Sequence, residues 1–371
     1  MRRVSVDRPS HAGNGRAERD FVVKEFAYRR ATDVDEALRL AAAGGDTRFL
    51  GGGTNLVDLM KNGVEAPERL IDVRFLPLGG ISETSGGGML LGATTTNSDI
   101  AAHPDIRRRY PALSQAILAG ASGQLRNMAT AAGNLLQRTR CGYFADPSEP
   151  CNRRAPGSGC GALAGEHHNH AILDWSPSCV ATHPSDMAVA LAAFDAHVRY
   201  QTMEGAGALP LSRFYLPVGD SPHEETALPG HALITGIALP SVTPTLRSRY
   251  RKVRERASYA FATVSVAAAL EVLEGRILDV RIALGGVASQ PWRARVAEDM
   301  VRDAAADAEL FRTAADAELS AARPLRDNAL HSLKGSARNE FHAAMVVEQF
   351  SQCGGGISQA AEGFSRTIAT P

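Results

Sequence analysis

Four cysteines lie close together in a part of the chain that has neither helical nor strand periodicity. This stretch runs from about residue 138 to 180 and contains Cys141, Cys151, Cys160 and Cys179. Loops of this length without their own secondary structure are uncommon in compact domains and are usually functional or disordered. Because thiols bond to each other or to metals, we expect the four cysteines to hold the loop in one conformation. They could do so as two disulfides, a zinc site or an iron–sulfur cluster.

The spacing of the cysteines, C-x₉-C-x₈-C-x₁₈-C, decides little by itself. It fits neither the paired cysteines of zinc knuckles nor the compact run of bacterial ferredoxins. Zinc could also use nearby histidines, although a histidine run on a polar loop is more often exposed: His167, His168, His170 and His183. Disulfides, zinc and a cluster therefore all stay open on the residues alone. Cys353 stands apart, and we expect it to be a free thiol.

Arginines accompany the cysteines: Arg138, Arg140, Arg153 and Arg154. Positive charge near a site of four thiolates offsets their negative charge and raises the reduction potential of a cluster. The alternative is that these arginines form a solvated basic loop or a docking surface. The arginines could also serve both the cysteine site and such a surface.

A glycine turn, Gly51-Gly52-Gly53-Thr54-Asn55, connects a strand at 48–50 to a short helix. Glycine lets the backbone approach an anion closely, and successive N–H groups would hold a diphosphate. The turn is neither G-x-G-x-x-G nor a P-loop. The alternative is a tight strand-to-helix turn.

A second small-residue signature is Thr130-Ala-Ala-Gly133-Asn134. Small side chains permit a flat ring to lie against the backbone, and the amide of Asn134 can bond to ring heteroatoms. The alternative is close packing between a helix and a loop.

The remaining pattern predicts an α+β protein. We expect a hairpin at 81–96, a helix at 186–194, a strand at 196–202, a second hairpin from 261–273 and 277–284, and two alanine-rich helices within 293–322. The expected organisation is a flexible extension (1–24), a first domain (25–204), a Pro- and Gly-rich linker (205–245), a C-terminal domain (246–340) and a tail of unclear structure (341–371).

The composition excludes some functions. The 371 residues carry 40 Lys+Arg and 40 Asp+Glu, so no bulk charge recruits nucleic acid or a membrane surface. No apolar run is long enough to span a membrane. Arg2 and Arg3 lack the apolar region of a signal peptide after them, so we expect a cytoplasmic protein or one exported to the periplasm on a partner's signal.

Three segments together resemble the FAD-binding subunit of molybdenum hydroxylases, the family of xanthine dehydrogenase, aldehyde oxidoreductase and carbon monoxide dehydrogenase flavoproteins. They are FLGGGTNLVDLMK (49–61), LRNMATAAGNLLQ (125–137) and THPSDMAVAL (182–191). The segments YRKVRERASYAFATVSVAAAL and RIALGGVASQPWRA resemble its C-terminal domain. The resemblance implies a two-subdomain FAD-binding domain of the vanillyl-alcohol oxidase/PCMH type with an inserted iron–sulfur loop, followed by a C-terminal α+β domain with a small antiparallel sheet.

The resemblance also implies roles for individual residues. Those expected on the FAD diphosphate are Arg48, Phe49, Leu50, Gly51, Gly52, Gly53, Thr54, Asn55 and Leu56. Those expected near the flavin or elsewhere on FAD are Thr130, Gly133, Asn134, Asp186 and Lys252. The cysteine loop resembles that of periplasmic-type aldehyde oxidoreductases, which implies a [4Fe–4S] cluster on Cys141, Cys151, Cys160 and Cys179; the flavoprotein subunit of 4-hydroxybenzoyl-CoA reductase has a similar insertion.

The function implied is electron transfer within a heterotrimer, with no catalytic side chain on this chain. Electrons released by a molybdenum cofactor-binding large subunit would pass through a [2Fe–2S] small subunit to FAD and on to an external acceptor. The aldehyde oxidoreductase type is expected, and a xanthine dehydrogenase or hydroxybenzoyl-CoA reductase type is the nearest alternative. A self-contained FAD oxidoreductase and a non-redox binding protein held by disulfides or zinc are the rivals from other classes.

Overall fold

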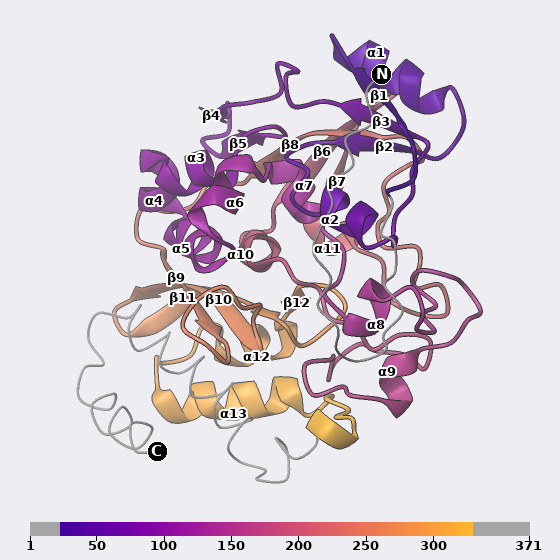
Figure 1. Ribbon diagram of the computed structural model, residues 1–371. Coiled ribbons are helices and arrows are strands. Elements are labelled where there is room, and N and C mark those ends of the chain that lie inside the picture. Colours follow the sequence, from indigo (N-terminus) through magenta and orange to yellow (C-terminus); the bar gives the residue numbers. More distant parts are fainter. Residues whose placement is uncertain (1–22, 329–371) are drawn as a thin grey trace.

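The computed structural model describes residues 23–328, which form three β-sheets with helices between and beside them (Figure 1). In that view the three-stranded sheet lies at the upper right, the five-stranded sheet beside it to the left, and the four-stranded sheet below both. The predicted mixture of helices and sheets is confirmed. Nearly all of the expected N-terminal extension, the whole tail and Cys353 lie outside the described residues.

The three-stranded sheet is parallel, with β3 between β1 and β2. Its elements are β1 (Ala27–Arg30), α1 (Val34–Ala42), β2 (Thr47–Leu50), α2 (Leu56–Lys61) and β3 (Arg69–Asp72). Parallel neighbours need a crossover connection, and the glycine turn with α2 supplies it between β2 and β3. The predicted strand, glycine turn and short helix are therefore confirmed. Leu38 of α1 and Ile71 of β3 pack in the small core beneath it.

The five-stranded sheet is antiparallel, in the order β4-β5-β8-β6-β7. Its strands are β4 (Ile81–Glu83), β5 (Met89–Gly92), β6 (His197–Thr202), β7 (Gly205–Pro210) and β8 (Leu233–Leu239). The segment 205–245 was expected to be a linker, yet it supplies β7 at one edge and β8 at the centre. An edge strand tolerates glycines and a terminal proline. The sequence of β7 therefore resembles that of a linker although it forms a strand.

Helices cover the five-stranded sheet and separate it from the sheet below. They are α3 (Asn97–Ala102), α4 (Pro104–Arg109), α5 (Pro111–Ala119), α6 (Gly123–Met128), α7 (Ala131–Leu135), α10 (Asp186–Ala193) and α11 (Leu211–Phe214). α10 is apolar on all sides, and all its residues but one are buried, which is typical of a helix inside a protein. Figure 1 shows it between the upper helices and the lower sheet.

The four-stranded sheet, in the order β12-β11-β10-β9, contains the predicted C-terminal hairpin. Its elements are β9 (Arg247–Val253), β10 (Val264–Leu273), β11 (Arg276–Gly285), β12 (Trp292–Arg293), α12 (Arg295–Val301) and α13 (Ala308–Leu319). Alternate residues of β10 face opposite cores: Ala267 and Ala269 face the core around α10, whereas Val266 and Ala268 face α12 and α13.

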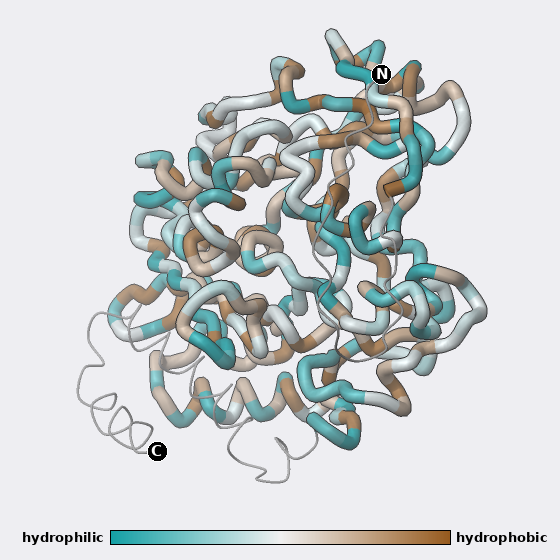
Figure 2. The backbone as a smooth tube through the Cα atoms, viewed as in Figure 1, coloured by the Kyte–Doolittle hydropathy of each residue, from teal (hydrophilic) through white to brown (hydrophobic). Residues whose placement is uncertain are grey.

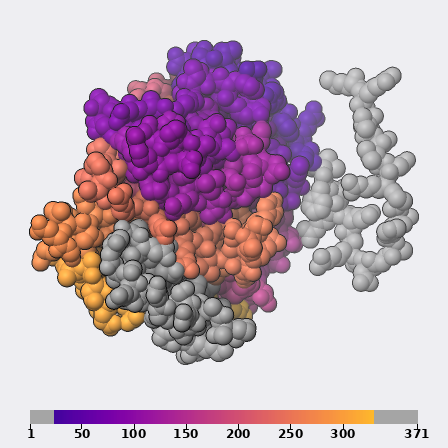
Figure 3. Space-filling view, turned by 90° about the vertical axis from the view of Figure 1, so that its left-hand side faces the viewer, coloured from indigo at the N-terminus to yellow at the C-terminus, as the bar shows by residue number. Residues whose placement is uncertain are grey.

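α13 closes the bottom of the molecule with one apolar face. Its buried Phe311, Ala314, Ala315 and Leu319 recur at helical spacing, and Figure 2 shows hydrophilic and hydrophobic residues alternating along it. On the face seen in Figure 3, the group α3–α6 lies directly above the C-terminal sheet. No helix among the described residues is long and apolar enough to cross a membrane.

The cysteine loop has little regular structure, as predicted. Between residues 138 and 180 it forms two single helical turns, α8 (Gly142–Ala145) and α9 (Gly161–Ala164). The rest is held by turns and isolated bridges, one of which pairs Cys151 with Cys160.

The main core predicts a large effect of truncating Phe194. Its ring is fully buried and meets Tyr110 edge-on, with ring centroids 5.2 Å apart. Phe194→Ala should lower the free energy of unfolding by about 3–5 kcal/mol, measured by urea denaturation. Leu118→Ala, at a side chain that is 55% exposed, is the control and should change it by no more than about 0.5 kcal/mol. Equal effects of both substitutions would contradict this core assignment.

Candidate functional site

The two glycine signatures pack directly against each other. A Cβ on Gly52 would overlap the carbonyl oxygen of Met128, and a Cβ on Gly51 would lie 2.7 Å from Oγ1 of Thr130. Gly53 has a φ of +73°, in the left-handed region that glycine adopts without strain. The turn therefore requires glycine because two backbone segments approach closely there.

Asn55, at the end of the turn, ties the glycine loop to the start of the cysteine loop. Its Oδ1 accepts a hydrogen bond from the backbone N–H of Arg138 at 2.9 Å. Its Nδ2 is buried without a hydrogen-bond partner among the described residues. A buried amide donor without an acceptor is costly, so this group fits an anionic or acceptor-rich ligand beside the loop.

The second signature is organised by two side chains. Thr130 begins α7, and its Oγ1 accepts a hydrogen bond from Gly133 N–H at 3.2 Å. Asn134 Oδ1 accepts a hydrogen bond from Ser185, and Ser185 in turn caps α10. Asn134 therefore fixes where α10 starts, which is a structural role that sequence reasoning missed.

Asp186 and Lys252, predicted from distant segments, meet in the interior. Lys252 Nζ lies 2.8 Å from Asp186 Oδ2, and the Tyr250 hydroxyl donates to Asp186 Oδ1 at 2.5 Å. Burial, followed by the neighbouring Asp186 carboxylate, raises the pKa of Tyr250. Because Asp186 opens α10 and its partners lie on β9, this cluster fastens the C-terminal sheet to the first domain.

The remaining predicted residues of the glycine loop have different surroundings. Phe49 packs against the core of the three-stranded sheet, and the Leu50 carbonyl accepts a hydrogen bond from Val73. Thr54 and Leu56 are half-buried at the start of α2. Arg48 is exposed, beside Asp46 and Glu65.

The four cysteines of the loop converge on one small cavity. Cys141, Cys151, Cys160 and Cys179 all line it, and all four are free thiols, so the disulfide alternative is wrong for this structure. Among the described residues, no group of three or more His, Cys, Asp or Glu side chains is arranged to hold a single metal ion, so zinc gains no support.

One histidine of the loop contacts this cysteine site. His170 Nε2 lies 3.2 Å from Cys141 Sγ. Burial lowers the pKa of His170 to about 4, so its ring is neutral at pH 7. Burial also raises the pKa of the Cys141 thiol to about 11, which favours the protonated thiol when nothing compensates its charge.

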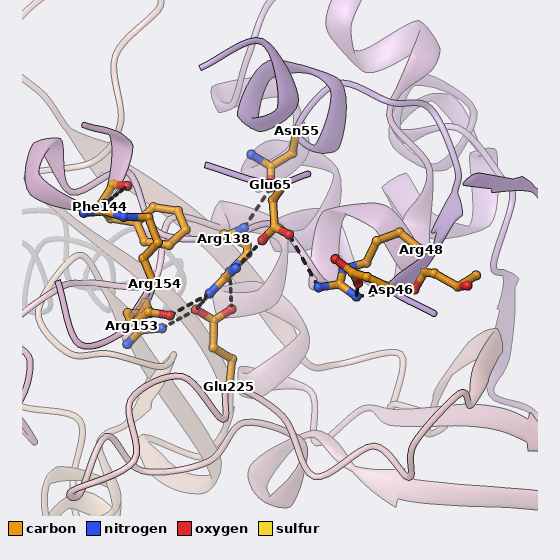
Figure 4. A network of polar contacts seen from close by, with 10 residues as sticks. Asp46, Arg48, Asn55, Glu65, Arg138, Phe144, Arg153, Arg154 and Glu225 are labelled. Carbon is orange, nitrogen blue, oxygen red and sulfur yellow. Dashed lines mark hydrogen bonds and ion pairs between the residues drawn. The ribbon is translucent and has the colours of Figure 1, made fainter. Parts of the chain in front are cut away.

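A chain of charges connects the glycine loop to the cysteine loop (Figure 4). Arg138 forms ion pairs with Glu65 and Glu225, and Arg153 also pairs with Glu225 at 2.8 Å. Glu65 additionally faces Arg48 at 3.5 Å. A cavity of about 660 Å³ borders this network.

Comparison with known proteins gives the family. Residues 24–242 match the FAD-binding domain of molybdopterin dehydrogenases, and residues 248–333 match the C-terminal domain of carbon monoxide dehydrogenase flavoproteins. The chain belongs to this family of FAD-binding subunits. Members of the family are oxidoreductases.

Two curated relatives of this FAD-binding subunit illustrate the range of similarity. It is 52% identical over 279 residues to the aldehyde oxidoreductase FAD-binding subunit PaoB of Escherichia coli, covering 74% of this chain and 86% of the relative. It is 26% identical over 330 residues to the glyceraldehyde dehydrogenase medium chain of Sulfolobus acidocaldarius, covering 88% and 98%.

Solved structures share the fold of this FAD-binding subunit. A chain of carbon monoxide dehydrogenase from Hydrogenophaga pseudoflava has a TM-score of 0.67 at 24% identity, covering 89% of this chain and 96% of that one. A chain of quinoline 2-oxidoreductase from Pseudomonas putida has a TM-score of 0.68 at 21% identity, covering 91% and 99%.

Sequence reasoning missed the acidic partners in the site of the FAD-binding subunit. Glu65 follows α2, and Glu225 lies between α11 and β8, in the segment expected to be a linker. Neither belongs to a recognisable motif. The arginines of the cysteine loop were the available signal, because buried charges are normally paired.

His183, beside the 660 Å³ cavity, gives a prediction for the pH dependence of stability. Its ring packs on Tyr215 with centroids 4.5 Å apart, and its Nε2 is buried without a hydrogen-bond partner in the part of the chain that the structure describes. Burial lowers the pKa of His183 from 6.5 to about 3. Below pH 6.5 the unfolded chain therefore binds a proton that the folded chain does not. Stability should fall as the pH drops from 6.5 towards 3, by about 1.4 kcal/mol per pH unit from this group.

Urea denaturation between pH 7 and 4 measures this slope. His183→Gln should reduce the slope of unfolding free energy against pH by about 1.4 kcal/mol per pH unit, which is the contribution of one proton. His223→Gln, at a side chain that is 41% exposed, is the control and should leave the slope unchanged. The same slope in the wild type and in His183→Gln would show that His183 is not the group responsible.

Proposed function

We propose that this chain is the FAD- and [4Fe–4S]-containing electron-transfer subunit of a molybdenum hydroxylase that oxidises aldehydes. The observation that carries the FAD site is the packing of the two glycine signatures against each other, together with the buried amide donor of Asn55 at the end of the first, which has no partner among the described residues. The aldehyde specificity rests on the 52% identity to an aldehyde oxidoreductase subunit.

In this proposal the glycine loop, residues 48 to 56, holds the FAD diphosphate. Backbone N–H groups at Gly51 to Gly53 and the Nδ2 of Asn55 would donate hydrogen bonds to it. Thr130, Gly133 and Asn134 would lie along the flavin, with the Asp186–Lys252 pair at the start of α10. When bound, FAD supplies the electron-carrying chemistry, and the chain supplies position and electrostatics.

The cysteine loop would hold the cluster through Cys141, Cys151, Cys160 and Cys179. Four free thiols around one cavity, without a carboxylate among its lining residues, form the soft donor set that iron–sulfur clusters use. The four cysteines would supply one thiolate ligand to each iron of such a cluster. A cluster would also compensate the thiolate charge that burial opposes at Cys141.

The proposed partners are a molybdenum cofactor-binding large subunit and a [2Fe–2S] small subunit, with an external electron acceptor. Support comes from the relatives, which are named as FAD-binding subunits and medium chains. Within residues 23–328 the four loop cysteines are the only ones, which leaves no second cysteine set for a [2Fe–2S] centre.

The FAD site is tested by Gly52→Val. A branched side chain at this position overlaps the Met128 carbonyl and displaces the loop from the diphosphate. The purified variant should lose its flavin absorbance near 450 nm while iron and sulfide remain. Gly123→Ala, where an added Cβ meets nothing within 4 Å, is the control and should keep full flavin. A Gly52→Val protein with full flavin occupancy would place FAD elsewhere.

The cluster is tested by iron and sulfide analysis of anaerobically purified protein. The wild type should contain about four irons per chain. Single substitutions to Ser at Cys141, Cys151, Cys160 and Cys179 should each sharply reduce iron, because a hydroxyl is a poor ligand for these clusters. Cys353→Ser, outside the described residues, should not. An iron-free wild type that is folded and loaded with flavin would reject the cluster.

A further inference from the structure

Two of the four arginines near the cysteines are committed to other partners. Arg154 donates hydrogen bonds to the carbonyl oxygens of Tyr143 and Phe144, at 2.9 and 2.7 Å, and so stabilises the turn α8. Arg140 lies over the ring of Phe261, 5.0 Å from its centroid, and pairs with Asp58 at 3.9 Å, while its Nε is buried without a partner among the described residues. Neither of these two arginines is among the residues that line the cysteine cavity.

Arg153 is different, because its side chain lines the same cavity as Cys179. The neighbouring residues hold the two segments together, since Asn152 Nδ2 donates a hydrogen bond to the Ser178 carbonyl at 3.0 Å. The Arg153 side chain is only 9% exposed. Burial opposes its charge, and the Glu225 carboxylate, 2.8 Å from Arg153 Nη1, compensates it.

Glu225 is the counter-charge that both Arg138 and Arg153 share. Arg138 Nε and Nη2 lie 3.1 and 3.2 Å from its carboxylate, and Arg153 Nη1 lies at 2.8 Å (Figure 4). Arg138 also donates to the Arg153 backbone carbonyl at 3.3 Å. Burial works against the charge of Glu225, but the two guanidinium groups hold its pKa below the usual range, so it is ionised at pH 7.

We propose that Arg153 is a positioning residue that places positive charge beside Cys179. In this proposal the negative charge of Glu225 partly cancels the electrostatic effect of Arg153 on the four-cysteine site. The inference rests on the proposed cluster and deepens it by naming the side chains that set its reduction potential. Arg138 fixes both partners and joins them through Asn55 to the glycine loop.

The physical reason is electrostatic. Reduction of a cluster adds one negative charge, which a nearby cation stabilises, so a cation raises the potential. A carboxylate bound to that cation opposes this effect. In a poorly solvated interior such interactions are screened less than at the surface. The cation and the anion should therefore shift the potential in opposite directions when each is neutralised.

The experiment is a redox titration of the full-length, anaerobically purified chain, followed by electron paramagnetic resonance after its iron content has been measured. Arg153→Gln should lower the cluster potential, and Glu225→Gln should raise it. Each shift should change the ratio of reduced to oxidised cluster at a fixed potential by about tenfold, which is about 59 mV for a one-electron couple. Arg153→Lys, which keeps the charge, should stay close to the wild type.

Glu224→Gln is the matched control, because this neighbouring side chain is 65% exposed and should leave the potential unchanged. If Arg153→Gln loses iron, the test rests on the potentials of the other two variants. Glu225→Gln should still have a higher potential than the wild type, and Arg153→Lys should still match it. If Arg153→Gln and Glu225→Gln both keep four irons and their reduction potentials are unchanged, or shift in the same direction, the inference about these two residues is wrong. The proposed cluster would still stand. An iron-free wild type would reject the proposed cluster, and this inference with it.

Discussion

The close approach of the glycine loop to the backbone at Met128–Thr130 is the constraint on which the rest of the structure depends. A side chain on Gly52 would overlap the Met128 carbonyl, so the two segments can meet only if that position carries no Cβ. The contact places the turn between β2 and α2 against the residues that begin α7, and α7 leads directly into the cysteine loop. One backbone contact thus sets the relative position of both signatures and of the loop that follows.

Charge pairing then fixes the cysteine loop, because the loop has few apolar residues with which to pack. Arg138 bonds to Asn55 through its backbone and to Glu65 and Glu225 through its guanidinium. Breaking one partner of such a buried pair is strongly destabilising, because the other charge is left uncompensated. The network therefore holds the loop in place and, through Arg153, brings positive charge to the cysteine site.

The C-terminal domain is joined to the first domain in a similar way, by a buried polar cluster within an apolar interface. α10 is covered on all sides, and its first residue, Asp186, receives both Lys252 and the hydroxyl of Tyr250 from β9. The helix thus fixes the sheet through packing, and the ion pair fixes its register. Two residues that the family resemblance assigned to FAD also have this structural role.

The sequence by itself determined the local elements and the family. Periodicity and turn residues predicted the glycine turn after β2, the helix α10 and the hairpin β10–β11, because these signals depend on neighbours in the chain. Only the tertiary structure decided that β7 and β8 join the five-stranded sheet, that Asp186 meets Lys252, and that Glu225 compensates two arginines. The two side-chain clusters pair residues that are 64 to 87 positions apart in the chain. A glutamate in a Pro- and Gly-rich segment has no local pattern that reveals its partner, because only the folded chain brings the opposite charge beside it.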